Sequence, residues 1–294
     1  MRKAKLIAIS IIFFVIFIIG LTGCASIKDK SKIPEVMPMK PISSSSGDNV
    51  KAIDYNHYLK KIWVVKSWNG GAYDSFSFFI SRIENGIIEG KLSTGSIAYP
   101  DFYFYSLEPS KKSGDLSGIV NNGVAECQFS DKVRNKGNVT LIFKENDEIE
   151  AKIKYMDKGE AYEDLPLDGN YLFRPYHLSD IKDFIPFKEH SFSIDLNSWG
   201  SVNFISGEVN HGDKVYPAAY LTNEHDDILY KFQASFKTGS ELLEASIKDI
   251  NNDGLKDVVI TTGFIDDPDA GRIEWIFYQM SDGLFCDSEL NGNK

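Results

Sequence analysis

Cysteine is scarce in this sequence of 294 residues: three cysteines are too few for a small domain held together by disulfide bonds. Basic residues are in the minority, with 32 Lys and Arg against 42 Asp and Glu, a net charge of −10. A nucleic-acid-binding protein needs a basic surface to neutralise phosphates, so this balance argues against that class. With 43% hydrophobic and 25% charged residues, the composition is that of a folded globular protein.

Motifs that would identify an enzyme class are also missing. No two of the five histidines have the spacing of zinc ligands, and neither Cys127 nor Cys286 has a nearby cysteine. The Gly-x-Ser-x-Gly turn of serine hydrolases and glycine-rich phosphate-binding loops are absent. Carboxylate-pair chemistry of the glycosidase kind stays an alternative, because 42 acidic residues offer many pairs and nothing selects one of them.

One long hydrophobic run is present, at residues 6–21, and it follows Arg2, Lys3 and Lys5. Its 16 residues are short for a membrane-spanning helix, which needs about 20. A basic start, an apolar run and small residues at its end are typical of a secretory signal peptide. The alternative is an anchor helix that is not cleaved.

The run ends in Leu21, Thr22, Gly23 and Cys24. This ending resembles the lipobox of bacterial lipoproteins, Leu-x-Gly-Cys. The resemblance implies that residues 1–23 are removed and that Cys24 carries a diacylglycerol and becomes the new N-terminus. The chain would then be anchored in the cell membrane on its extracytoplasmic face. The remaining chain would have 29 basic and 42 acidic residues, so we expect an anionic membrane to repel it.

The next segment, residues 24–50, shows no apolar periodicity. It contains Pro34, Pro38 and Pro41, followed by four serines and Gly47. This composition predicts a flexible tether that separates a folded part from the membrane.

Residues 51–160 alternate between apolar and polar positions, which predicts an antiparallel β-domain. The expected strands are 61–68, 76–83, 87–92, 115–120, 124–129, 138–143 and 148–155. Asn85-Gly86 and Asn122-Gly123 are strong hairpin signals, and residues 144–147 form a third expected turn. Such a meander suits a small barrel or sandwich, and a lipocalin-like cup is one possible form.

Residues 165–294 predict a second β-rich domain. Its expected strands are 191–196, 202–209, 218–222, 228–234, 242–250, 258–264 and 273–280. Residues 178–184 predict one short helix, with Ser179 as its cap and Pro186 after its end. The whole chain is therefore expected to be all-β, with two antiparallel domains that are barrel- or sandwich-like.

The second domain contains one stretch with recognisable chemistry. Side-chain oxygens occupy loop positions 1, 3, 5 and 9, a glycine occupies position 6, and position 7 offers a backbone carbonyl; these residues are Asp249, Asn251, Asp253, Asp257, Gly254 and Leu255. Calcium prefers six to eight oxygen ligands, and this spacing arranges oxygens around one point. Position 12 is Ile260 rather than the bidentate Glu of an EF-hand, and β-branched residues follow, so the loop is expected to join two strands.

Residues 240–289 resemble the FG-GAP/VCBS-type repeats of extracellular proteins, whose Asp-x-Asn-x-Asp-Gly-x-x-Asp loops bind calcium between β-strands. The ending Asp282-Gly283-Leu284-Phe285 matches how such repeats close. The resemblance implies a structural Ca²⁺ ion. Without the twelfth-position Glu, the expected dissociation constant is that of extracellular modules, roughly 10⁻⁴–10⁻³ M. The alternative is a polar turn without an ion.

Four further groups of residues have a functional and a structural interpretation. Asp266, Asp267 and Asp269 could bind a second ion or form a solvated turn around Pro268, and residues 223–227 could form a site or a hairpin turn. Aromatic residues at 102–105, Trp63 and Trp68 could line a sugar- or peptide-binding face or build the core. Cys127 and Cys286 could form a disulfide or stay separate buried thiols.

The sequence thus predicts a non-catalytic, lipid-anchored binding module with a structural calcium site. Its partners would be the bilayer, through Cys24, and an unknown extracellular ligand or protein. Two alternatives are a polymer hydrolase with a carboxylate pair in the groove between the two domains and a lipocalin-like carrier that uses the first domain.

Overall fold

The computed structural model describes residues 53–67, 76–93, 113–159, 168–211, 214–232, 240–265, 267, 271–281 and 283–290. Residues 1–50, which include Cys24 and the expected tether, lie outside the described residues, as do Trp68 and the aromatic run at 102–105. Antiparallel strands make up about 66% of the described chain and helices about 6%, which confirms the predicted all-β fold. Within the described ranges, no helix has the length and apolar character needed to cross a membrane.

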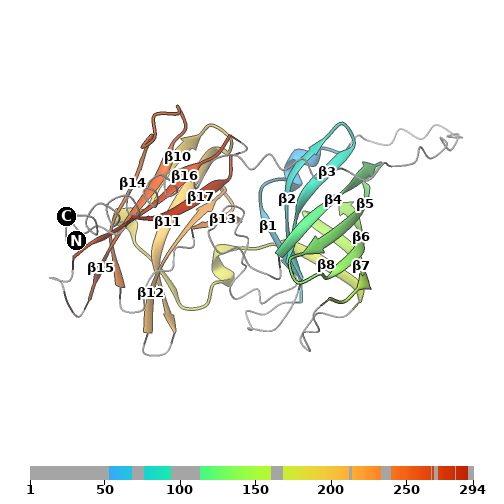
Figure 1. Ribbon diagram of the computed structural model, residues 1–294, viewed down its shortest axis with the longest axis horizontal. Coiled ribbons are helices and arrows are strands. Elements are labelled where there is room, and N and C mark those ends of the chain that lie inside the picture. Colours follow the sequence, from blue (N-terminus) through green and yellow to red (C-terminus); the bar gives the residue numbers. More distant parts are fainter. Residues whose placement is uncertain are drawn as a thin grey trace, which may run out of the picture. The chain divides into compact units, whose positions relative to one another are not determined.

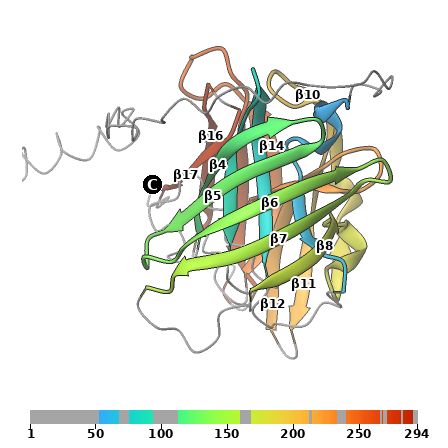
Figure 2. The same cartoon turned by 90° about the vertical axis from the view of Figure 1, so that its right-hand side faces the viewer.

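The first domain is a closed barrel of eight antiparallel strands in sequence order (Figures 1 and 2). The strands are β1 (Ile62–Val65), β2 (Ser77–Glu84), β3 (Ile87–Ser93), β4 (Ser113–Asn121), β5 (Val124–Asp131), β6 (Lys136–Lys144), β7 (Glu148–Asp157) and β8 (Gly169–Pro175). A 3-10 helix, η1 (Tyr55–Tyr58), precedes β1. Strand β8 pairs with both β7 and β1, so the barrel extends beyond the boundary expected near residue 160.

The predicted hairpins have the backbone geometry that Asn-Gly turns favour. Asn85 and Gly86 have φ of 52° and 75°, and Asn122 and Gly123 have φ of 48° and 80°. Two central residues with positive φ are required by the type I′ turn, whose twist matches that of the flanking strands. Both turns connect directly paired strands, β2 with β3 and β4 with β5.

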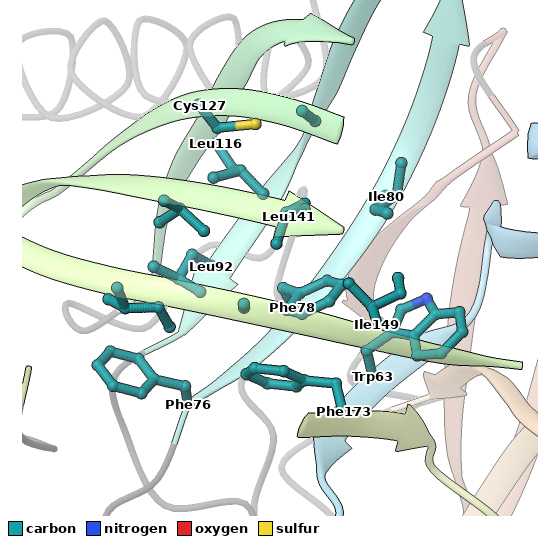
Figure 3. Packing of buried hydrophobic residues seen from close by; sticks show 14 of the residues in the cluster. Trp63, Phe76, Phe78, Ile80, Leu92, Leu116, Cys127, Leu141, Ile149 and Phe173 are labelled. Atoms are coloured by element: carbon teal, nitrogen blue, oxygen red, sulfur yellow. The ribbon is translucent and has the colours of Figure 1, made fainter. Parts of the chain in front are cut away.

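Large hydrophobic side chains fill the interior of the barrel (Figure 3). Trp63, Phe76, Phe78 and Phe173 are all fully buried there, and aromatic rings such as Phe78 and Phe173 pack with centroids 4.6 Å apart. An eight-stranded barrel has an interior just wide enough for side chains to fill or for one small ligand. In the described residues, side chains fill it, so Trp63 belongs to the core rather than to a sugar-binding face.

The second domain is a sandwich of two antiparallel sheets. One sheet consists of β9 (Phe184–Pro186), β10 (Phe192–Leu196), β11 (Gly200–His211), β12 (Lys214–Thr222) and β13 (Ile228–Phe232). The other consists of β14 (Ser240–Lys248), β15 (Asp257–Phe264), β16 (Ile273–Gln279) and β17 (Phe285–Leu290). A single hydrophobic core takes residues from both sheets, for example Phe232 and Phe277, whose rings are 5.1 Å apart. Burial of this shared core holds the sheets together.

The prediction of a helix over residues 178–184 is wrong. Only a 3-10 turn forms, η2 (Leu178–Asp180), and His177 rather than Ser179 is its cap. Arg174 holds Asp180 with two hydrogen bonds, at 2.6 and 2.9 Å, which stabilise this single turn. A second 3-10 turn, η3 (Lys188–His190), precedes β10. Short segments seldom repay the cost of nucleating an α-helix, and here β9 pairs with β11 instead.

Strand β1 is buried on both faces, which explains why it lacks the alternation of the other barrel strands. Trp63 and Val65 face the barrel core. Ile62 and Val64 belong to a separate cluster that also contains residues of the sandwich, among them Tyr220. The barrel and the sandwich therefore share an apolar contact along β1. The polar residue Lys61 comes directly before this strand.

Candidate functional site

The loop singled out by its sequence joins β14 to β15, as predicted. Its side chains accept hydrogen bonds from its own backbone. Asp249 Oδ2 accepts from the Gly254 N–H at 2.9 Å, and Asn251 Oδ1 accepts from the Asp253 N–H at 3.1 Å. Gly254 has φ of 85°, a conformation that favours glycine. These bonds bring the side chains of Asp249, Asn251 and Asp253 together on an exposed turn.

Asp257, the fourth expected side-chain ligand, is placed differently because its carboxylate is fully buried. Its Oδ2 accepts from the Ile250 N–H at 2.8 Å, and its Oδ1 accepts from the Gln279 N–H at 2.9 Å. One side chain thus holds the start of the loop and the end of β16. Asp257 acts as a brace for the loop rather than as part of its exposed cluster.

At the exposed part of the expected calcium site, the side-chain atoms are of the chemical type that Ca²⁺ binds. Asp249, Asn251 and Asp253 offer the oxygens that Ca²⁺ prefers, and an oxygen that accepts one N–H retains a second lone pair. The Leu255 N–H is held by Asp253 Oδ1 at 2.8 Å, which orders the residue whose carbonyl is the expected fifth ligand. No group of three or more His, Cys, Asp or Glu side chains in the described part of the chain is arranged to hold a metal ion.

The remaining candidates contribute little to a site. Asp266 and Asp269 lie outside the described residues, and Asp267 is exposed. Cys127 is a free, buried thiol in the barrel, and burial raises its pKa to about 12. The free Cys127 agrees with the alternative of separate thiols, and the Cys286 side chain lies outside the described residues.

A second location is a cleft of about 430 Å³ formed by three segments, of which the sequence had offered only residues 223–227 as a site. Asn56, His57, Leu59, Lys60 and Lys61 come from η1 and the residues after it. Trp199 comes from the turn between β10 and β11, and Ser201 and Val202 come from the start of β11. Asn223, Glu224 and His225 come from the turn between β12 and β13, and Leu229 comes from β13. Residues from the barrel side and from the sandwich therefore line one cavity.

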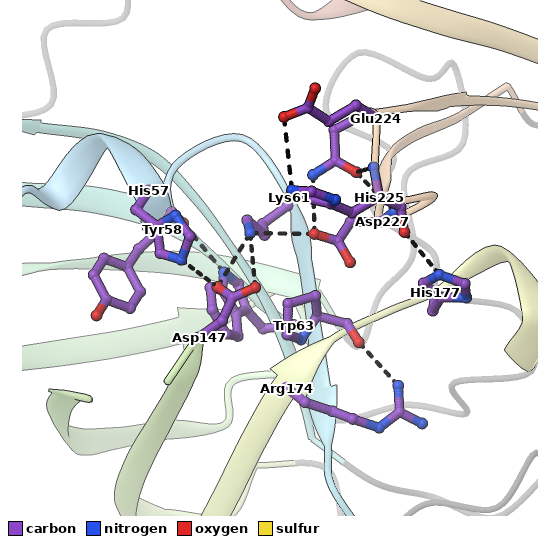
Figure 4. Close-up of polar contacts among 12 residues, drawn as sticks. His57, Tyr58, Lys61, Trp63, Asp147, Arg174, His177, Glu224, His225 and Asp227 are labelled. Carbon is purple, nitrogen blue, oxygen red and sulfur yellow. Dashed lines mark hydrogen bonds and ion pairs between the residues drawn. The ribbon is translucent and has the colours of Figure 1, made fainter. Parts of the chain in front are cut away.

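Lys61 is the most buried cation of the cleft, with only 7% of its side chain exposed. Its Nζ lies 3.2 Å from Asp147 Oδ1 and 3.3 Å from Asp227 Oδ2 (Figure 4). Asp147 belongs to the β6–β7 turn of the barrel, and Asp227 to the β12–β13 turn of the sandwich. A buried charge needs such partners, because removing them leaves it uncompensated in a poorly hydrated place. The three charges therefore join the two sides of the cleft.

The β12–β13 turn holds its shape through side-chain hydrogen bonds. Asn223 Oδ1 accepts from the N–H groups of His225 and Asp227, both at 2.9 Å, and Asn223 Nδ2 donates to Asp227 Oδ2 at 2.9 Å. The His177 ring nitrogen Nε2 lies 2.8 Å from the carbonyl oxygen of His225. The expected hairpin turn at 223–227 is thus present, and it also forms one wall of the cleft.

Asp147 also orients a histidine at the edge of the cleft. His57 Nε2 lies 3.0 Å from Asp147 Oδ1, so one carboxylate contacts both His57 and Lys61 (Figure 4). The His57 side chain is half-exposed and lines the cavity. A histidine held in this way has a defined orientation toward a bound molecule.

Lys60 differs from its neighbour Lys61 in having no carboxylate within ion-pairing distance among the described residues. Its Nζ donates to the Ser198 carbonyl and lies 5.8 Å from the centre of the Trp199 ring. Burial lowers the pKa of Lys60, because the charged form loses hydration. The cleft therefore contains one partly desolvated cation without a counter-charge from the described chain.

Trp199 forms part of the cleft wall and is fixed in place. Its Nε1 donates to the Gly283 carbonyl at 2.6 Å, and its ring packs 6.2 Å from that of Tyr230. The wall is therefore formed before any ligand binds.

Comparison of the chain with protein-family models, curated proteins and solved structures gives no match.

Proposed function

We propose that this chain is a lipid-anchored extracytoplasmic binding protein whose ligand site is the cleft beside Lys60 and Lys61. The observation that carries the proposal is a cavity of about 430 Å³ with walls held by the ion pairs of Lys61. Small-molecule sites have volumes of about 300–1,000 Å³ and combine apolar walls with a few fixed polar groups. Leu229 and Trp199 supply the apolar part here, and His57 and Asn223 supply polar groups.

The anchor in this proposal is a diacylglycerol on Cys24, supported by the lipobox-like ending of the hydrophobic run. Two acyl chains are sufficient for stable membrane attachment. Labelled palmitate should be incorporated into the chain in bacterial cells and should be absent from a Cys24→Ala variant. Equal labelling of both chains would contradict the lipoprotein assignment.

The proposal includes a structural Ca²⁺ ion bound by the side chains of Asp249, Asn251 and Asp253 and by the Leu255 carbonyl. The buried Asp257 holds the loop in shape. When bound, the ion would neutralise the acidic cluster and tie the loop between β14 and β15. Heat of Ca²⁺ binding that disappears in the Asp253→Ala variant would support this role. No heat at concentrations up to about 10 mM, above the weak end of extracellular modules, would contradict it.

A binding function is favoured over the hydrolase alternative by the position of Lys61. A pair of catalytic carboxyls must flank the bond that is cleaved. Asp147 and Asp227 converge beside the cleft, but the Lys61 ammonium occupies the space between them. The carrier alternative is disfavoured because side chains fill the described barrel interior.

The binding function is tested by a thermal-shift screen of sugars, amino acids, short peptides and organic acids against the full chain in detergent. Ser201→Trp places a large ring in the cleft, and Ser117→Trp, on the exposed face of β4, is its matched control. We expect compounds that raise the Tm of the wild type and the control but not of Ser201→Trp. If every active compound also stabilises Ser201→Trp, the cleft is not the binding site.

A further inference from the structure

We propose that the cleft is selective for a small organic anion and that Lys60 is the residue that recognises its negative group. This inference rests on the proposed binding function and specifies the class of ligand. It follows from four features of the cleft: the lack of a counter-charge at Lys60, the supply of donors around it, the repulsion of large polyanions and the apolar wall.

The first feature appears when the two neighbouring lysines are compared. Lys61 has two carboxylates within 3.3 Å of its Nζ. Lys60 is also partly buried, yet its Nζ contacts only a carbonyl oxygen and the face of an aromatic ring. In a chain with 42 acidic residues, none of those described pairs with it. An ammonium group has three N–H donors, so the Ser198 carbonyl leaves two for a ligand. A carboxylate or phosphate group would supply the missing charge through charge-assisted hydrogen bonds.

Other groups of the lining can add to recognition of an anion. His57 and His225 both line the cavity, and the His57 ring is oriented by Asp147. Asn56 adds an exposed amide on the same wall. The Lys61 charge contributes little to a ligand, because two carboxylates already neutralise it. Lys60 is therefore the main source of uncompensated positive charge.

The surrounding charge limits the size of the anion. Glu224 also lines the cleft, its side chain is 87% exposed, and it lies 3.6 Å from His225 rather than beside Lys60. The chain as a whole is acidic. A long polyanion would meet this negative field over its whole length, whereas a small anion meets mainly the local charge of Lys60. The expected ligand thus has one negative group rather than a charged polymer backbone.

The apolar part of the lining indicates an organic molecule rather than a bare inorganic ion. Leu59, Val202 and Leu229 line the cavity together with Trp199. Such side chains give an inorganic ion no hydrogen bonds, but they can contact the carbon frame of a sugar acid or a hydroxy acid. The body of the ligand would lie against this wall, with its negative group at Lys60.

The test compares two probes that share a ring and differ in charge, glucuronate and glucose, with inorganic phosphate as a third probe. Binding to the full chain in detergent is measured at equal ionic strength for the wild type, Lys60→Met, Lys60→Arg and Lys188→Met. Lys188 is exposed and does not line the cleft, so its variant controls for loss of one positive charge. The pKa of Lys60 is followed by NMR in the wild type and in Lys188→Met.

We expect glucuronate to bind with a roughly millimolar Kd and at least about tenfold more tightly than glucose, because one charge-assisted hydrogen bond contributes about that factor. Lys60→Met should remove the difference, whereas Lys60→Arg and Lys188→Met should retain it. The Lys60 pKa should rise when glucuronate binds, because a nearby negative charge favours the ammonium form. A purely structural role for Lys60 would not produce this rise.

Three results would overturn the inference. Equal binding of glucose and glucuronate would show a ligand site that does not select for charge, and it would leave the proposed binding function intact. Unchanged anion binding in Lys60→Met would exclude Lys60 as the recognising residue. If no probe binds at about 10 mM, well above a millimolar Kd, the small-anion assignment fails. The screen with Ser201→Trp then decides separately whether the cleft binds anything else.

Discussion

Two loops rich in Asp and Asn, residues 223–227 and 249–257, have nearly the same local chemistry and different surroundings. Each begins with a side chain that accepts N–H groups further along its own turn, Asn223 in the first and Asp249 in the second. Each ends with a buried aspartate. Asp227 pairs with Lys61 of the barrel, whereas both Asp257 oxygens accept N–H groups within the sandwich.

This difference shows that a polar turn acquires its role from what its last aspartate contacts. The first loop connects two domains and lines a cleft. The second loop is complete within the sandwich and presents three polar side chains to solvent. Four experiments can sharpen or break this comparison.

The largest effect is expected from Lys61→Met, which leaves Asp147 and Asp227 without their shared cation. We expect the free energy of unfolding to fall by about 3–5 kcal/mol, the usual cost of breaking a buried ion pair. Urea denaturation measures this change. Lys66→Met removes an exposed pair with Glu148 and should cost under about 1 kcal/mol. A loss of similar size in both variants would contradict the role assigned to Lys61.

The next effect is expected from Asp257→Ala in calcium-free buffer. Two N–H groups, of Ile250 and Gln279, lose their acceptor, at about 1 kcal/mol or more each, so stability should fall by at least about 2 kcal/mol. Asp253→Ala changes an exposed residue and should cost much less without calcium. Equal losses would show that Asp257 is not a special brace of the second loop.

A smaller effect is expected from calcium itself. With a Kd of roughly 10⁻⁴–10⁻³ M, Ca²⁺ at about 10 mM should stabilise the folded chain by about 1.4–2.7 kcal/mol. The Tm should rise with calcium in the wild type and in Asn223→Ala, which alters only the first loop, but not in Asp253→Ala. A rise in Tm that survives in Asp253→Ala would place the ion elsewhere.

The smallest effect on stability is expected from Lys60→Met. Burial lowers the pKa of Lys60 in the folded chain. At pH values below that lowered pKa, the charged Lys60 therefore reduces the stability of the folded state. Removing the charge should leave stability at pH 7 within about 0.5 kcal/mol of the wild type, or slightly above it. As the pH rises toward 10.5, the stability of the wild type should increase relative to that of the variant. Lys60 then loses its proton in both the folded and the unfolded state, so the cost of burying its charge disappears. A large loss at pH 7 would indicate an unrecognised counter-charge at Lys60.

Much of the fold could be predicted because the strand signals are local. The Asn-Gly turns require positive φ at two successive residues, and few sequences other than Asn-Gly favour it. Strand β7 alternates between buried and more exposed residues from Glu148 to Met156, and its predicted and observed starts coincide at Glu148. The loop at 249–257 was expected between two strands and lies between β14 and β15.

Other elements escaped prediction because long-range pairing determines them. Strand β8 contains Gly169 and Pro175, which weaken any strand signal, and it forms because β1 and β7 offer it hydrogen-bonding partners. The short helix expected at 178–184 is only a 3-10 turn at Leu178–Asp180, and its last expected residue, Phe184, belongs to β9, which pairs with β11. Lys60 and Lys61 carry no motif, so nothing in the sequence distinguished them from the other lysines.

The sequence by itself therefore determined the β-rich class, the turn positions and the acidic loop, because backbone conformation and side-chain alternation depend on neighbouring residues. The closure of the barrel, the burial of Asp257 and the cleft were decided only by the tertiary structure. Lys61 meets Asp147 and Asp227 across 86 and 166 residues of chain. At such separations, which charges become paired depends on how whole strands pack, and among the described residues this packing left Lys60 in the cleft without a carboxylate within ion-pairing distance.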